Sequence, residues 1–157
     1  MKTLQAKREL CTGCNICEMV CALGHTAKVN PAQARLKVIF TDDEFCYPII
    51  CRHCQDPACL SACPVQAMAI DSGTGAVVLD EEKCTACRAC IEACPFGAIF
   101  TGPKGEILKC DLCGGNPLCV KYCYPRPEGN FPHFPSTEEA CLVYGEVLPE
   151  AKAKEKS

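Results

Sequence analysis

Sixteen of the eighteen cysteines in this chain of 157 residues fall into four consecutive runs, which we number one to four in chain order. Each run has three closely spaced cysteines, a gap of three residues, and a fourth cysteine. The runs are Cys11, Cys14, Cys17 and Cys21; Cys51, Cys54, Cys59 and Cys63; Cys84, Cys87, Cys90 and Cys94; and Cys110, Cys113, Cys119 and Cys123. This spacing is typical of cubane iron–sulfur sites and predicts four [4Fe–4S] clusters.

The spacing has a physical reason. Three thiolates on one short loop are able to bind three corners of a cubane, while the amides between them point at its sulfides. We expect the fourth cysteine to begin the following helix and, as in two-cluster ferredoxins, to bind the neighbouring cluster. Pro64 and Pro95 follow the fourth cysteines of runs two and three, where a fixed φ and a missing N–H are tolerated.

Disulfides and zinc are the alternative uses of these cysteines. A disulfide scaffold needs an oxidising compartment. Residues 1–10 contain no apolar run and no twin arginine, which predicts neither a signal peptide nor a membrane span and favours a cytoplasmic protein. Zinc is the stronger rival, because paired Cys-x2-Cys elements form tetrahedral sulfur sites. Three cysteines in one loop, repeated four times, fit iron–sulfur clusters better.

Composition limits both the core and the partners. The chain has no Trp, six Phe and four Tyr, and its hydrophobic share of 48% includes the cysteines. We therefore expect the clusters to cross-link the chain and to supply much of its stability. The net charge is −3 and the Lys and Arg residues are scattered, so nucleic-acid binding is not expected.

The segments between the runs predict small elements. Residues 67–79 and 98–109 each hold two apolar stretches around a glycine-containing turn and predict β-hairpins, and residues 34–41 predict one strand. Helices near the fourth cysteines, as at 60–63 and 91–94, are expected to be one or two turns long. The fold class expected is α+β, with irregular loops dominating.

Residues after Cys123 differ in composition. Residues 124–135 hold too many prolines for helix or sheet, so they are expected to lie extended, as a strap over the clusters or as a docking arm. Residues 139–147 predict a strand or a short helix, and residues 150–157 a charged tail.

Several residues lie outside the ligand pattern. Cys46 and Cys141 are expected to be buried structural thiols, and His53 to face solvent beside its cluster rather than to donate to a sulfide. His25 and His133 have no partner that the sequence identifies. We find no dinucleotide loop, phosphate loop or Ser/His/Asp set, and a cubane with four cysteine ligands has no open position, so a non-catalytic protein is expected.

The chain resembles the four-cluster, ferredoxin-like electron-transfer subunits of multisubunit oxidoreductases. The specific stretches are residues 11–14, 51–59, 82–99 and 109–115. The short run four and residues 30–35 look most like small subunits that accompany tungsten aldehyde oxidoreductase-type enzymes. The resemblance implies single-electron transfer between the large catalytic subunit of an anaerobic oxidoreductase and a ferredoxin or flavin-containing partner.

The resemblance also implies tandem, nested bacterial ferredoxin-like modules. The inner module would span residues 46–105 and the outer module residues 1–45 and 106–125, followed by an extension at 126–157. The implied ligand sets are Cys11, Cys14 and Cys17 with Cys123; Cys51, Cys54 and Cys59 with Cys94; Cys84, Cys87 and Cys90 with Cys63; and Cys110, Cys113 and Cys119 with Cys21. After Cys123 the sequence departs from the family, because Tyr124 and Pro125 stand where relatives continue into a closing strand.

Three alternative functions remain within this chemistry. They are a free polyferredoxin, an electron-transfer subunit of a hydrogenase or formate dehydrogenase, and an iron–sulfur maturation factor. Because an outer cluster is expected near the surface at each end, head-to-tail self-association is a further hypothesis.

Overall fold

The structure is a computed structural model that describes residues 2–42, 45–125 and 139–146. Within these residues the strands form antiparallel pairs and the helices are mostly short. The strands are β1 (Lys2–Ala6), β2 (Lys37–Phe40), β3 (Cys46–Ile49), β4 (Met68–Ile70), β5 (Val77–Leu79), β6 (Ile99–Thr101), β7 (Ile107–Lys109) and β8 (Leu142–Glu146). The helices are α1 (Ile16–Thr26), α2 (Ala58–Ser61), α3 (Ala89–Ala93) and α4 (Leu118–Lys121), with 3-10 turns η1 (Arg8–Leu10), η2 (Pro31–Gln33) and η3 (Leu112–Gly115).

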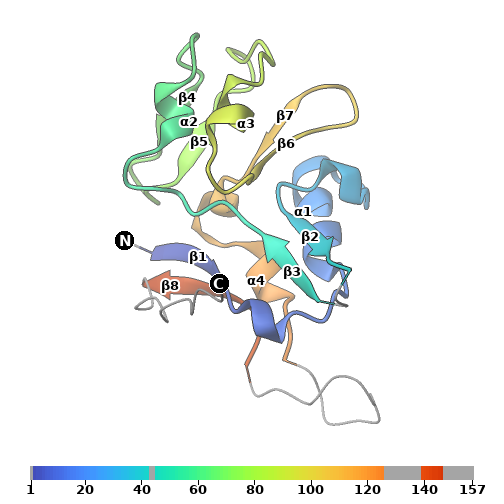
Figure 1. Cartoon of the computed structure of the whole chain (residues 1–157). Helices are drawn as coiled ribbons and strands as arrows, with labels where there is room; N and C mark the ends of the chain where they lie inside the picture. Colours follow the sequence, from blue (N-terminus) through green and yellow to red (C-terminus); the bar gives the residue numbers. More distant parts are fainter. Residues whose placement is uncertain (1, 43–44, 126–138, 147–157) are drawn as a thin grey trace.

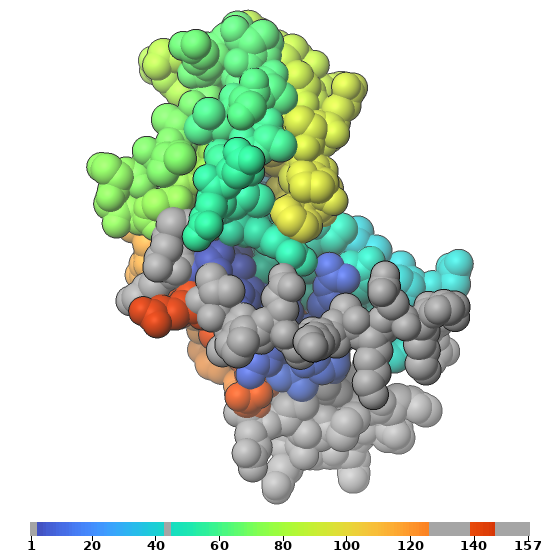
Figure 2. Space-filling model, turned by 60° about the vertical axis from the view of Figure 1, so that its left-hand side comes forward, coloured from blue at the N-terminus to red at the C-terminus, as the bar shows by residue number. Residues whose placement is uncertain are grey.

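The elements gather in two groups (Figure 1). The pairs β4–β5 and β6–β7 lie with α2 and α3 in the upper group, and the pairs β1–β8 and β2–β3 lie with α1 and α4 below. We call residues 51–109 the inner half and the remaining described residues the outer half. Figure 2 shows much of the inner half, in green and yellow, as a lobe that projects from the rest.

Each half has its own small core. The inner core consists of Met68, Val77, Cys90, Ile99 and Ile107. The outer core consists of Leu4, Cys21, Ala34, Leu36, Ile50, Ala76, Leu112, Cys119 and Leu142. Ala76 comes from the inner half, so the two halves are in contact there. Cysteines contribute to both cores, as expected for a chain with little aromatic material.

The expected hairpins and single strand are present. Residues 67–79 form the β4–β5 hairpin and residues 98–109 the β6–β7 hairpin, both antiparallel. Residues 34–41 contain β2, which pairs with β3. The turn after β4 is held by Asp71, whose Oδ1 accepts hydrogen bonds from the backbone N–H and the hydroxyl of Thr74, both at 2.7 Å.

Helix α1 contradicts the expectation that helices are only one or two turns long, since it has 11 residues. Its Gly24 faces Leu118 of α4 so closely that a Cβ atom there would lie 2.5 Å from Leu118 Cδ1. The buried Glu18 ties α1 to β2, because its Oε1 accepts the N–H of Val38 at 2.6 Å. Tertiary packing on both sides therefore extends this helix beyond what its cysteines predict.

The fourth cysteines do not begin the following helices, which corrects a second expectation. Cys63 and Cys94 come after α2 and α3, and Cys94 has extended φ and ψ of −79° and 111°. The reason is the proline that follows each of them, because a residue before proline is disfavoured in the helical conformation. Cys123 follows α4, and Cys21 lies inside α1.

The N-terminal strand was not predicted. Residues 2–6 form β1, which pairs antiparallel with β8 in the register Ala6 to Leu142. Of the two structures predicted for residues 139–147, a strand or a short helix, the strand is present, at Leu142–Glu146. Most of the proline-rich segment, together with His133 and the charged tail, lies outside the described residues. None of the helices in the described ranges combines the length and the apolar character that crossing a bilayer requires.

Candidate iron–sulfur cluster sites

The four cysteine loops share one backbone feature. The residue before the second cysteine of each run has a positive φ, namely Gly13 at 67°, His53 at 46°, Ala86 at 54° and Leu112 at 57°. A left-handed conformation costs a residue with a Cβ atom roughly 1–2 kcal/mol, yet three of these four residues carry one. Successive N–H groups in such a turn converge into a concave anion-binding nest. Each loop is therefore shaped to surround an anionic group.

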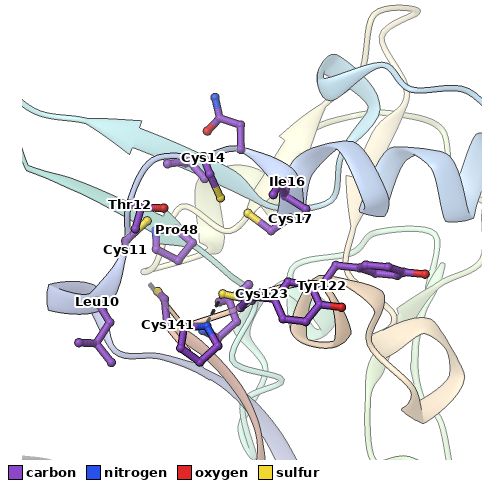
Figure 3. A pocket seen from close by; sticks show the side chains of 15 residues that line it. Leu10, Cys11, Thr12, Cys14, Ile16, Cys17, Pro48, Tyr122, Cys123 and Cys141 are labelled. Atoms are coloured by element: carbon purple, nitrogen blue, oxygen red, sulfur yellow. Dashed lines mark hydrogen bonds between the residues drawn. The ribbon is translucent and has the colours of Figure 1, made fainter. Parts of the chain in front are cut away.

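Run one lines an open cavity of about 410 Å³. Figure 3 shows Cys11, Cys14 and Cys17 gathered around it, together with Cys123, which follows α4 (Leu118–Lys121). Burial and the charges of Cys14 and Cys11 raise the pKa of the Cys17 thiol to about 12. Thiols crowded in this way ionise together only when a cation or metal cluster binds them.

Run four gathers with Cys21 in the outer half. Burial raises the pKa of Cys110 to about 12. Burial also raises the pKa of Cys119 far above its usual value, with further increases from Cys110, Cys21 and Cys113. The structure therefore brings together the four residues of the implied set.

The loop cysteines of run two lie near Cys94 in the inner half. Burial raises the pKa of Cys59, and the charges of Cys51 and Cys94 raise it further, against a lowering effect of Lys109. Cys54 belongs to the same loop. The structure thus brings the fourth cysteine of run three to the loop of run two.

Run three gathers with Cys63. Burial and the charge of Cys84 raise the pKa of Cys90, and Cys87 adds to the increase. Cys63 lines one small pocket together with these three cysteines. In the inner half, therefore, the fourth cysteine of each run lies beside the loop of the other run.

The four groups of cysteines also lie near one another in a definite order. Electrostatic interactions join Cys90 to Cys59, Cys110 to Cys51, and Cys119 to Cys17. The order is therefore run three, run two, run four and run one. Cys87 and Cys14, which belong to the two end groups of this series, are exposed.

The sulfur of each fourth cysteine accepts a backbone N–H. In the inner half the donor is four residues further along the chain, and in the outer half it is distant in sequence. The pairs are Ala67 N to Cys63 Sγ at 3.2 Å, Ala98 N to Cys94 Sγ at 3.5 Å, Arg35 N to Cys21 Sγ at 3.3 Å, and Leu142 N to Cys123 Sγ at 3.4 Å. Such bonds stabilise negative charge on sulfur.

His25 is a site residue that sequence reasoning missed. Its Nδ1 lies 2.7 Å from the carbonyl of Cys21 and its Nε2 lies 3.1 Å from Asp111 Oδ1. Both acceptors require N–H donors, so the ring is an imidazolium. The hydrogen bond with Asp111 raises the pKa of His25 to about 10. The available signal was its position four residues after Cys21, on the same helical face.

Asp111 also binds Arg35, whose Nη1 lies 2.9 Å from its Oδ2. Burial alone would raise the pKa of Asp111, but hydrogen bonds from His25 and the Cys113 N–H hold it below its usual range. His25, Asp111 and Cys113 offer ligand atoms within 4.8 Å of one another. Because both ring nitrogens of His25 already donate and Cys113 belongs to run four, we assign no separate ion there.

Cys46 and Cys141 are buried, as predicted, and both lie against the run-one loop. Cys46 Sγ lies 3.5 Å from the carbonyl oxygen of Cys11. A side-chain hydrogen bond with Cys11, together with burial, raises the pKa of Cys141 far above its usual value. The sequence pattern did not indicate this proximity to run one.

His53 does not face solvent, which corrects the expectation for this residue. Its exposed fraction is 1%, and its Nδ1 accepts the N–H of Val77 at 3.0 Å. Burial and the nearby charge of Lys109 lower its pKa to about 4. Its Nε2 is buried without a hydrogen-bond partner in the described part of the chain. An unsatisfied buried N–H of this kind fits a site built for an additional acceptor.

Comparison with known proteins agrees with the cysteine pattern. The model of the family described as "4Fe-4S dicluster domain" matches residues 43–127, and a model described as "4Fe-4S binding domain" matches residues 8–24. These two matches together include all four runs.

Three curated relatives are informative. The chain is 44% identical to the "Aliphatic sulfonate oxidoreductase, polyferredoxin-like subunit" of Pyrococcus furiosus, over 73% of this chain and 66% of that protein. It is 33% identical to a "Putative electron transport protein" of Escherichia coli, over 72% of this chain and 78% of that protein. It is 39% identical to one of the subunits of tetrathionate reductase from Archaeoglobus fulgidus, over 66% of this chain and 50% of that protein.

The chain therefore spans about two thirds of the first relative and half of the third. The family match covers more than half of the chain and includes the complete runs two, three and four. Together with the left-handed turn that the four cysteine loops share, these findings show that the chain belongs to the 4Fe–4S dicluster domain family, the ferredoxin-like iron–sulfur proteins that include oxidoreductase subunits.

Proposed function

We propose that this chain holds four [4Fe–4S] clusters and relays single electrons within an oxidoreductase complex. The observation that carries the proposal is the left-handed turn before the second cysteine of every run. Backbone strain such as that at Leu112 tends to collect at functional sites, and a cluster bound by the loop accounts for it here. The ligand sets proposed are those in which three loop cysteines join the fourth cysteine of the partner run.

The order of the sites supports a relay. A cubane bound by four thiolates accepts and releases one electron without an open coordination position. In support of this, the run-two and run-four cysteines lie between the other two groups in the series, and Cys87 and Cys14, in the groups at its two ends, are exposed. Electrons would therefore enter beside one exposed end and leave beside the other.

The partners are proposed by analogy. Two of the three relatives are named as subunits of oxidoreductases, so a large catalytic subunit is the expected partner at one end. We propose a cytoplasmic, anaerobic enzyme of the tungsten aldehyde oxidoreductase type as that partner, with a ferredoxin or flavin protein at the other end. In this arrangement the chain itself performs no substrate chemistry.

Iron analysis tests the proposal. Protein purified without oxygen should contain about sixteen irons and an equal amount of acid-labile sulfide per chain, and dithionite should bleach its visible absorbance. Fewer than about twelve irons per chain would refute four clusters. A matched pair of variants, Cys87→Ser in a proposed ligand and Cys46→Ser outside the ligand sets, should differ, with iron lost only from the first.

The same preparation separates a dedicated subunit from a free polyferredoxin. A large subunit that remains bound through size exclusion supports the dedicated role. A monomer that reduces several unrelated enzymes supports the free carrier. Transfer of iron and sulfide to an apo-protein would instead indicate a maturation factor, and growth of the complex with protein concentration would indicate head-to-tail association.

A further inference from the structure

A lysine is buried where the two halves meet. Lys109 ends β7 at the boundary between the inner half and run four, and its exposed fraction is only 2%. Its Nζ lies 3.4 Å from Cys51 Sγ and 3.4 Å from the Cys110 carbonyl, and it also donates to the Val77 carbonyl. Three acceptors match the three N–H groups of an ammonium, so Lys109 carries a positive charge.

His53, in the run-two loop, is hydrogen-bonded to the same residue of β5, Val77. Its Nδ1 accepts the N–H of Val77, whereas Lys109 donates to the carbonyl of that residue. The two side chains thus satisfy both polar backbone groups on the free edge of β5. An Nδ1 that accepts requires the proton to be on Nε2, and this Nε2–H is buried without a partner among the described residues.

Among the described residues, the positive charge of Lys109 is not neutralised by a carboxylate, unlike the other positive charges near the cysteine loop of run four. Beside run four, the cations His25 and Arg35 face the carboxylates of Asp111 and Glu81. Lys109, in contrast, donates to one sulfur and two carbonyls, and it is absent from the ion pairs of the described ranges.

We propose that Lys109 and His53 make the run-two cluster the most readily reduced of the four, so that the electron rests where the inner and outer halves meet. Reduction adds one negative charge to the cluster. A buried ammonium donating to Cys51 Sγ stabilises that charge, and the unpartnered Nε2–H of His53, which belongs to the loop of the same run, adds to the effect. This inference rests on the proposed four-cluster function.

An EPR-monitored redox titration of the anaerobically purified full chain tests the inference. Lys109→Met should lower the equilibrium constant for reduction of one cluster at least tenfold, which is about 59 mV in the potential of a one-electron couple. The potentials of the other three clusters should be unchanged. Lys109→Arg keeps the charge and should restore the wild-type value. His53→Asn, chosen because Asn tolerates the left-handed φ of 46°, should shift the same cluster in the same direction by a smaller amount.

Two controls identify the effect. Lys104→Met removes an exposed lysine from the β6–β7 turn and should leave all four potentials unchanged, because water screens its charge. Cys54→Ser alters or removes the run-two cluster and therefore shows which signal belongs to it.

The outcomes separate this inference from the proposed function. A wild-type chain with few irons refutes the four clusters themselves. A fully loaded Lys109→Met variant with unchanged potentials refutes the role of the lysine charge. A Lys109→Arg variant whose potential shifts as much as that of Lys109→Met refutes it as well. If Lys109→Met does not load iron, His53→Asn decides, because an unchanged potential in that variant also overturns the inference.

Discussion

The inner and outer halves hold the fourth cysteine of each run in different ways. In the inner half, Cys63 and Cys94 each accept an N–H from the residue four positions further along. In the outer half, the N–H groups that reach Cys21 and Cys123 come from residues 14 and 19 positions away. A local turn therefore holds the fourth cysteine of each inner run, whereas the fourth cysteine of each outer run is held only after segments distant in sequence have met.

The inner half is also nearly symmetric. Cys63-Pro64-Val65-Gln66 and Cys94-Pro95-Phe96-Gly97 form equivalent turns, with φ of 52° at Gln66 and 59° at Gly97. The outer half has no such symmetry, since Cys21 lies in the long helix α1 and Cys123 is followed by Tyr124. Its closure depends on β1 and β8, which come from opposite ends of the described chain.

Removal of iron should have the largest effect and should expose this difference. A chelator added to the anaerobic protein is expected to unfold the outer half first, because its sites depend on distant contacts with large closure entropy. Hydrogen exchange followed over time measures the order. Amides of α1 and β8 should lose protection before those of β4 and β7, and simultaneous exchange of both halves would contradict the comparison.

Cavities in the two cores should have the next largest effect. Leu4→Ala, in the outer core, and Ile99→Ala, in the inner core, are each expected to lower the free energy of unfolding by about 3 kcal/mol. Urea unfolding of the iron-loaded proteins measures this change. Only Leu4→Ala should speed iron release from the outer half, and equal acceleration by both variants would show that the halves do not unfold separately.

The ion-pair group around Asp111 should contribute less. Asp111→Asn removes the partner of both the His25 imidazolium and Arg35 and is expected to cost about 2 kcal/mol, typical of hydrogen bonds to charged groups. Glu81→Gln is the matched control, because Glu81 binds the same arginine from an exposed position and should matter by less than about 1 kcal/mol. Thermal unfolding compares them, and equal losses would disprove the assignment.

The smallest effect should appear at the symmetric turns of the inner half. Gln66→Gly relieves a left-handed residue and is expected to raise the free energy of unfolding by about 1 kcal/mol. Gly97→Ala is the reverse change and should lower it by about the same amount, because the φ of 59° strains a residue with a Cβ atom; no clash is added, since this atom would meet nothing within 4 Å. Chemical unfolding should therefore show changes of opposite sign in the free energy of unfolding of the two variants. Changes of the same sign would mean that the two turns are not equivalent.

Much of the inner half was predictable from the sequence because its structure is local. The hairpins at 67–79 and 98–109 follow from alternating apolar residues around turn residues, and both are present. The positions of the fourth cysteines relative to the helices were predicted wrongly, although Pro64 and Pro95 carried the information through their effect on the preceding residue.

The errors in the outer half have a different cause. The length of α1 depends on its packing against Leu118 and on the hydrogen bond from Val38 to Glu18, and neither contact is visible in a local pattern. The sequence of β1 does not by itself predict a strand, and β1 forms because β8 pairs with it. One error in the inner half has the same cause, because the burial of His53 depends on the edge of β5, which lies 24 residues further along.

The sequence by itself determined the chemistry of this protein, because the identity and spacing of cysteines decide which inorganic group a loop is able to bind. It also determined the local turns that bring the loop amides together. Only the tertiary structure decided which side chains surround each sulfur, including the buried Lys109 beside Cys51 and the imidazolium of His25 beside Cys21. Burial and charge act through space, so no spacing along the chain reveals them.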